Sequence, residues 1–186
     1  LGRLVFGVVA PDLCRRNRLS ASDSKRTTYQ RSCLLETLGR YWPFGSETVD
    51  ALPIPAWGMP EQETLPPACE SIALPQWARE ASIEGGLLIP RWAYRQAEGE
   101  WTKVDWFAVC YWYLHNVAER VREEANGPIH SYAFRLKGWD TRLWERAWVN
   151  RIALFLRRWA AREAGSEEDE LGPLPETEII LTHDVD

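Results

Sequence analysis

Two stretches of this chain carry apolar side chains at helical spacing, and each apolar face must be covered by other parts of the protein. In the stretch 102–122 these residues are Trp106, Phe107, Cys110, Leu114, Val117 and Val121, preceded by Thr102 and Asp105 in a pattern that resembles a capping box. In the stretch 143–164 they are Trp144, Trp148, Ile152, Phe155 and Trp159, and Gly165 is placed to end the helix. With 45% hydrophobic residues, the chain can bury one large core around them.

Shorter apolar runs predict strands. Residues 4–10 form a continuous apolar run closed by Pro11 and Asp12, which is typical of a buried strand. Prolines divide the region 43–90 into brief pieces, of which 49–54, 70–74 and 87–89 are candidate strands. A further helix is expected over 27–38. The sequence therefore predicts an α/β fold with a mixed sheet and flanking helices.

The composition changes after residue 165 and predicts a boundary there. Residues 166–171 are rich in acids and prolines follow at 173 and 175, so 166–176 is expected to be a poorly packing acidic linker. A short apolar run at 178–182 then indicates the first strand of another domain. We therefore expect an accessory α/β domain over 1–165, a linker over 166–176 and the start of a truncated domain over 177–186.

Charge and hydropathy exclude several kinds of partner. The net charge of −5 is accounted for by five acids between positions 163 and 170, so the rest of the chain is neutral and gives no basic field for nucleic acid. A local basic cluster (Arg15, Arg16, Arg18, Lys25, Arg26 and Arg31) is interpreted as a solvated loop and helix start. The longest apolar run, 106–114, is too short to span a membrane, for which about 20 residues are needed.

The four cysteines are Cys14, Cys33, Cys69 and Cys110, and no two of them form a CxxC pair. We expect free, mostly buried thiols and favour the cytoplasm over export; two disulfides remain the alternative if the protein is exported. The three histidines, His115, His130 and His183, are too few and too far apart to build a histidine-rich metal centre, and His115 is expected to be structural or exposed.

The last six residues carry the strongest chemical signal. Asp184 and Asp186 stand two residues apart after an apolar run, and an extended chain directs both to the same side. Open α/β sheets and βα barrels react at the carboxyl ends of their strands. One carboxylate could hold a divalent cation while the other takes a proton from the metal-bound water. The competing interpretation is a pair of surface acids that cap a turn or helix.

The string Leu181-Thr182-His183-Asp184-Val185-Asp186 resembles the opening motif of bacterial polysaccharide deacetylase-like proteins of the NodB-homology type, which remove acetyl groups from N-acetylated sugars. Upstream, the strings at 104–108, 131–133 and 148–151 resemble the domain that precedes this motif in such proteins. The resemblance covers about positions 83–186. Residues 1–82 show no such likeness.

This resemblance implies a metal-dependent deacetylase with a distorted (βα) barrel, of which 177–186 would be the first strand and motif. Asp184 matches the general base and Asp186 takes the metal-ligand role, with a divalent cation, zinc, expected in the full-length protein and none in this chain alone. The common motif has adjacent acids, Thr-Phe-Asp-Asp-Gly, whereas here Val185 separates them. Because the family's histidine ligands belong to a later His-x-x-x-His motif that this chain does not contain, the chain alone is expected to be inactive. Its implied partners are its own C-terminal catalytic domain and a polysaccharide.

Other functions stay open. Haloacid-dehalogenase-type phosphatases and some glycosyltransferases also have a strand followed by Asp-x-Asp. A non-enzymatic glycan-binding or interaction module is the remaining alternative, because eleven tryptophans are present. The four on the helical stripes, Trp106, Trp144, Trp148 and Trp159, are expected to pack in the core. The better candidates for a glycan surface are the five in the loop-rich stretch: Trp42, Trp57, Trp77, Trp92 and Trp101.

Overall fold

The structure is a computed structural model that describes residues 28–32, 34–36, 39, 46–94, 100–129 and 136–174. Residues 28–32 and 34–36 are helical, as expected for the stretch 27–38. The other helices are α2 (Ser46–Asp50), α3 (Trp106–Leu114), α4 (Val117–Asn126), α6 (Arg142–Glu145) and α7 (Trp148–Ala164). The strands are β1 (Cys69–Ala73) and β2 (Gly86–Pro90). The predicted strand at 4–10 and the predicted start of a barrel at 177–186 lie outside the described residues.

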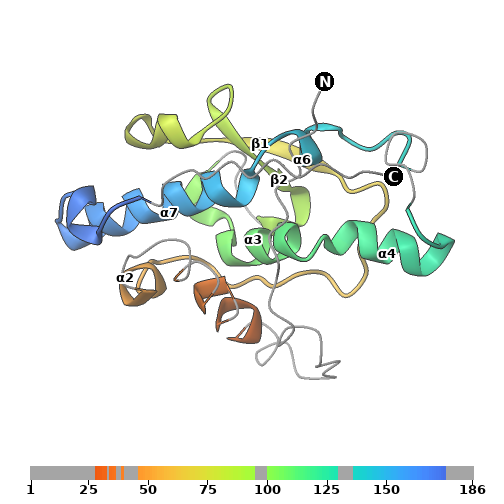
Figure 1. The fold of residues 1–186 in the computed structure, drawn as a ribbon, viewed down its shortest axis with the longest axis horizontal. Coiled ribbons are helices and arrows are strands. Elements are labelled where there is room, and N and C mark those ends of the chain that lie inside the picture. The colour runs from red at the N-terminus through yellow and green to blue at the C-terminus, as the bar shows by residue number, and fades with distance from the viewer. Residues whose placement is uncertain are drawn as a thin grey trace, which may run out of the picture.

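Helix α7 is the centre of the fold (Figure 1). It contacts α2, α3 and β2, and it lies between the hairpin and α2 in the view of Figure 1. Ile152, Phe155 and Trp159 are buried along it, as the helical stripe predicts. The helix ends at Gly165, which has a φ of 66° and so accepts the left-handed conformation that a side chain would disfavour. This confirms the predicted stop.

The two strands form an antiparallel hairpin whose register pairs Ser71 with Leu88. They confirm the strands expected near 70–74 and 87–89. All residues of β2 are buried, and the Tyr113 hydroxyl of α3 donates a hydrogen bond to the Leu88 carbonyl at 2.9 Å. An isolated two-stranded sheet is marginal in water, so packing against α3 and α7 is what stabilises this one. A Cβ at Gly86 would lie 2.8 Å from the Ile72 carbonyl oxygen, so the close approach of the strands requires glycine there.

Several expectations were wrong in detail. The strand expected at 49–54 is helix α2 followed by a loop, because Val49 and Leu52 are buried by packing of this short segment rather than by a sheet. Instead of a mixed sheet, the described residues contain the antiparallel pair alone. The overall α/β composition is as predicted.

Each of the two long predicted helices is interrupted. The first divides at Asn116, whose φ of 45° is left-handed, into α3 and α4. The second divides at the extended residue Arg146, so Trp144 belongs to α6 and not to the stripe of α7. Periodicity continues across both breaks, which is why the sequence does not reveal them. Among the described helices, none is both long enough and apolar enough to cross a bilayer.

Candidate functional site

The two residues on which the predicted chemistry depends, Asp184 and Asp186, lie outside the described residues, as do His130 and His183. Their roles as base and metal ligand stay predictions. Within the described stretches, no group of three or more His, Cys, Asp or Glu side chains is arranged to hold a metal ion.

Asp105 is the most deeply buried carboxylate of the described residues, with 2% of its surface exposed. It is itself the N-cap of α3, rather than the third residue of a helix capped by Thr102 as the capping box predicts, and it accepts hydrogen bonds from the backbone N–H of Ala108 at 3.0 Å and of Gly58 at 2.9 Å. Burial raises the pKa of Asp105, and the bonds from Ala108, Gly58 and Trp57 partly oppose that rise. These partners satisfy the carboxylate, so its role is to join the loop 56–58 to the start of α3.

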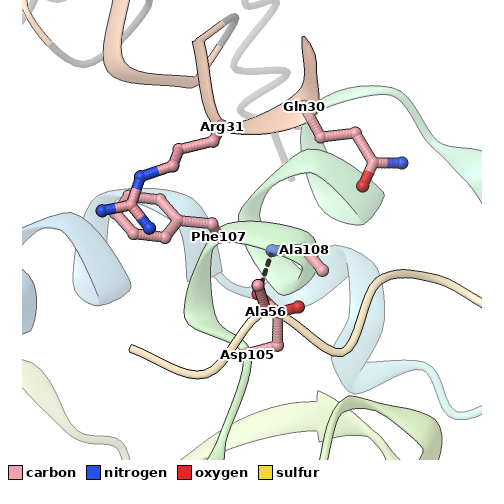
Figure 2. A pocket seen from close by; sticks show the side chains of 6 residues that line it. All are labelled: Gln30, Arg31, Ala56, Asp105, Phe107 and Ala108. Atoms are coloured by element: carbon pink, nitrogen blue, oxygen red, sulfur yellow. Dashed lines mark hydrogen bonds between the residues drawn. The ribbon is translucent and has the colours of Figure 1, made fainter. Parts of the chain in front are cut away.

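Figure 2 shows Asp105 beneath Arg31, whose guanidinium lies over the Phe107 ring at 4.4 Å from its centroid. The cavity between them has a volume of about 10 Å³, which is room for one water molecule at most. A second hollow, of about 700 Å³, is open to solvent and is also lined by Arg31. Arg31 forms an ion pair with Asp50, so neither of these two side chains is an unpaired catalytic group in either hollow.

A different group of acids and indoles comes together from five segments of the chain. We call it the acid–tryptophan cluster and define it by six residues: Glu63, Trp92, Trp112, Glu119, Trp139 and Trp144. The Trp112 indole donates to Glu63 Oε2 at 2.9 Å, and the Trp144 indole donates to Glu119 Oε1 at 2.7 Å. Trp139 stacks on Trp144 with ring centroids 6.1 Å apart.

Burial and neighbouring charges perturb the titratable groups of the acid–tryptophan cluster. Burial raises the pKa of Glu63, the Trp112 indole opposes that rise, and the negative charge of Glu119 adds to it. The fully buried Trp92 indole nitrogen faces the same carboxylate without a hydrogen bond of good geometry. Burial also raises the pKa of nearby Cys69 to about 12, and the charges of Asp140 and Glu63 contribute to it. The local field is therefore negative.

Sequence reasoning missed the two acids of this cluster. Glu63 lies in the proline-rich loop and Glu119 on the polar side of α4, and no motif or spacing connects them. Only the folding of the loop onto α3 brings Glu63 to Trp112, and only the docking of α6 on α4 brings Glu119 to Trp144.

The predicted glycan candidates behave differently from one another. Trp77 and Trp101 pack against Phe155 and Trp159, with Trp101 and Trp159 only 4.9 Å apart, so they belong to the edge of the core. Trp57 is 37% exposed, and its indole donates to the Lys103 carbonyl at 3.0 Å. Trp92 is part of the acid–tryptophan cluster, and Trp42 lies outside the described residues. Trp106, Trp148 and Trp159 are buried as expected, whereas Trp144 is half-buried.

The remaining candidate groups are structural. Cys110 is fully buried, which raises the pKa of its thiol far above its usual value and confirms the predicted inert core cysteine. His115 is 8% exposed, stacks on Tyr111 and has a pKa lowered by burial and by the charge of Arg120.

Two arginines of α7 contact the acidic segment that follows the helix. Arg157, which is 2% exposed, donates to the carbonyl of Glu168 at 3.0 Å and to that of Gly172. Arg158 pairs with Glu168 at 2.9 Å and with Glu80 at 2.6 Å. We call these contacts the arginine clamp. Two basic side chains of α7 therefore hold the chain at Glu168 and Gly172. The linker and the domain boundary stay predictions.

Comparison of the chain with protein-family models, with curated proteins and with solved structures found no match. The resemblance to polysaccharide deacetylase-like proteins therefore stays a hypothesis, based on the residues quoted above.

Proposed function

We propose that this chain is the accessory region of a metal-dependent polysaccharide deacetylase-like protein, and that its folded part holds the segment carrying Asp184 and Asp186 in place for a following catalytic domain. The motif at 181–186 supplies the chemical argument. In this proposal Asp184 acts as general base and Asp186 as metal ligand. The remaining metal ligands would be the histidines of a later motif in the complete protein.

The observation that carries the proposal is the arginine clamp. A flexible linker would leave the following segment free to sample many orientations, at an entropic cost each time that the two domains meet. Hydrogen bonds from one buried guanidinium to two carbonyls of the backbone instead fix the path of the chain up to Gly172. Such a fixed path suits a domain that positions its neighbour.

Acetate release from N-acetylated chitooligosaccharides tests the chemical part. We expect the complete gene product to release acetate only with a divalent cation present, and the 186-residue chain to release none. Acetate release by this chain alone, or metal-independent release by the complete gene product, would refute the proposed mechanism. Phosphate release from phosphomonoesters, or transfer of a sugar from a sugar nucleotide, would favour the other Asp-x-Asp enzymes.

Substitution of Arg157 tests the positioning part. In the complete gene product, Arg157→Gln should lower kcat/KM by about tenfold or more, because small misplacements of a reacting group have large effects on rate. Hydrogen exchange at residues 168–172 should become faster in the same variant. Arg146→Gln, at an exposed residue before the opposite end of α7, is the control and should change neither quantity. Faster exchange with unchanged kcat/KM would show that the clamp is merely structural.

A further inference from the structure

The hairpin has two outer edges, and the edge of β2 is closed. The backbone of Gly86 exchanges hydrogen bonds with that of Ile83 at 2.9 and 3.1 Å. The carbonyl of Leu88 accepts a hydrogen bond from the Tyr113 hydroxyl at 2.9 Å, and Pro90 has no N–H to offer. These contacts take up most of the groups with which a further strand would pair, so this edge of the sheet is protected.

The outer edge of β1 is open. Hydrogen bonds at both ends of the hairpin show which backbone groups face the partner strand: Arg91 donates to the Ala68 carbonyl at 2.8 Å, and Leu74 donates to the Gly85 carbonyl at 3.2 Å. In the antiparallel register, the even-numbered residues of β1 therefore face β2. Among the described residues, none forms a hydrogen bond with the outward-facing backbone groups, which belong to Cys69, Ser71 and Ala73.

The side chains of β1 leave this edge accessible. Ser71 and Ala73 are small and exposed. The strand contains no proline or lysine, and its one charged residue, Glu70, is paired with Arg91 at 3.1 Å. Proteins usually protect an exposed edge with such residues, because an open edge is a template for another strand. The edge of β1 is therefore free to pair.

The chain turns back beside α7 after that helix ends. Arg157 lies about two turns before the end of the helix, yet it donates hydrogen bonds to the carbonyls of Glu168 and Gly172. The segment after the helix therefore runs back along it, and Gly172 is held beside the middle of α7.

The arginine clamp also places this segment near the loop that follows β1. Arg158 pairs with Glu168 at 2.9 Å and with Glu80 at 2.6 Å. Glu80 belongs to η2 (Gln76–Ala81), a 3₁₀ helix that begins three residues after β1 ends and packs on α7. Residue 178 stands six positions after Gly172, and six extended residues span up to about 20 Å. That length allows the chain to reach the edge of β1.

From these contacts we propose that residues 178–182, which lie outside the described part of the structure, add to the outer edge of β1 as a third strand. Their sequence, Glu-Ile-Ile-Leu-Thr, is the predicted strand and is rich in side chains that favour a sheet. Because they approach from the loop that follows β1, they run antiparallel to it. A segment of the same chain has a high effective concentration at this edge, which favours it over a second copy of the protein.

The third strand would give the motif a fixed starting point. One edge of 178–182 pairs with β1, and the other stays open to a following domain, so Asp184 and Asp186 leave the sheet in a defined direction. The pairing itself rests on β1 and the arginine clamp; its value for catalysis rests on the proposed function.

The test is NMR of the ¹⁵N-labelled 186-residue chain. We expect slow hydrogen exchange at the amides of Ser71 and Ala73, and nuclear Overhauser effects between β1 and residues 178–182. Ile180→Pro should disrupt the third strand and speed exchange at both amides by about tenfold or more. The amide of Ile72 faces β2 and should be unaffected, which shows that the hairpin stays folded.

Glu176→Pro is the matched control, because prolines already stand at 173 and 175, and it should leave exchange at Ser71 and Ala73 unchanged. Fast exchange at these amides in the unsubstituted chain, or equal protection in Ile180→Pro, would overturn the proposal. Nuclear Overhauser effects from β1 to residues 4–10 would overturn it in favour of the first apolar run. Protection that disappears on dilution, together with a dimer in sedimentation, would overturn it in favour of a second copy.

Failure here is distinguishable from failure of the proposed function. If the complete gene product releases acetate while β1 shows no contact with 178–182, the strand pairing is wrong and the deacetylase proposal stands. If the pairing is observed and no acetate is released, the reverse holds.

Discussion

Replacing Asp105 by alanine should destabilise the fold more than any single exposed substitution. Its carboxylate accepts hydrogen bonds from the backbone of Ala108 and Gly58 at 2.9–3.0 Å and from that of Trp57, and it is 2% exposed. Loss of a helix cap costs about 1 kcal/mol, and a buried donor left without a partner costs about 1–3 kcal/mol. Release of the buried charge offsets part of this, as the raised pKa indicates.

The net loss for Asp105→Ala is therefore about 2–4 kcal/mol, which corresponds to a fall in Tm of about 5–15 °C for a chain of this size. Urea unfolding followed by tryptophan fluorescence measures the free energy of unfolding, and hydrogen exchange at Gly58 reports the local effect. Asp105→Asn keeps one acceptor oxygen and should lose about half as much. Asp169→Ala, at an exposed acid, should stay within about 0.5 kcal/mol of the wild type. A loss below about 0.5 kcal/mol in Asp105→Ala would show that water replaces the carboxylate and that the loop is not joined to α3 as described.

Three other measurements follow from the structure. The pKa of Glu63 in the folded protein should lie above its ordinary value of 4.5, so the free energy of unfolding should fall as pH rises through that raised pKa. Glu63→Gln should remove this pH dependence, and Glu119→Gln should lower the titration midpoint of Glu63 measured by side-chain ¹³C NMR. An unchanged midpoint in Glu119→Gln would argue that the two carboxylates are not close. Gly86→Ala should lower the free energy of unfolding in urea by about 1–3 kcal/mol, because the added Cβ meets the paired strand. Gly39→Ala, which has open space around the added Cβ, should be neutral or stabilising. Equal losses of stability in the two variants would contradict the close approach of the strands at Gly86. Cys110 should resist a thiol reagent at pH 8 until urea unfolds the chain, as mapped by mass spectrometry, and rapid labelling of the native protein would show that it is not buried.

Local patterns predicted the elements whose determinants are short-range. The stripe Ile152, Phe155 and Trp159 needs only the helical repeat, and Gly165 needs only a backbone that accepts positive φ, so both were predicted correctly. The predicted helix over 102–122 was right in type, but the structure begins α3 at Trp106 with Asp105 as its N-cap instead of Thr102. The chemistry at Asp184 and Asp186 stays a prediction from the sequence.

Contacts between distant segments decided the rest. The stretch 49–54 has the composition of an edge strand, yet packing against α7 makes its first part helical, because burial outweighs weak strand propensity. The breaks at Asn116 and Arg146 depend on how the neighbouring helices pack. The spacing of apolar residues continues across both positions and therefore does not reveal them.

By itself the sequence determined the buried stripe of α7, its end at Gly165 and the two strands of the hairpin, because each of these depends on residue identity or on neighbours within a few positions. Only the tertiary structure decided that the Trp112 and Trp144 indoles hold Glu63 and Glu119 and that Arg157 holds the chain at Glu168 and Gly172, because those contacts join positions that no short-range pattern relates.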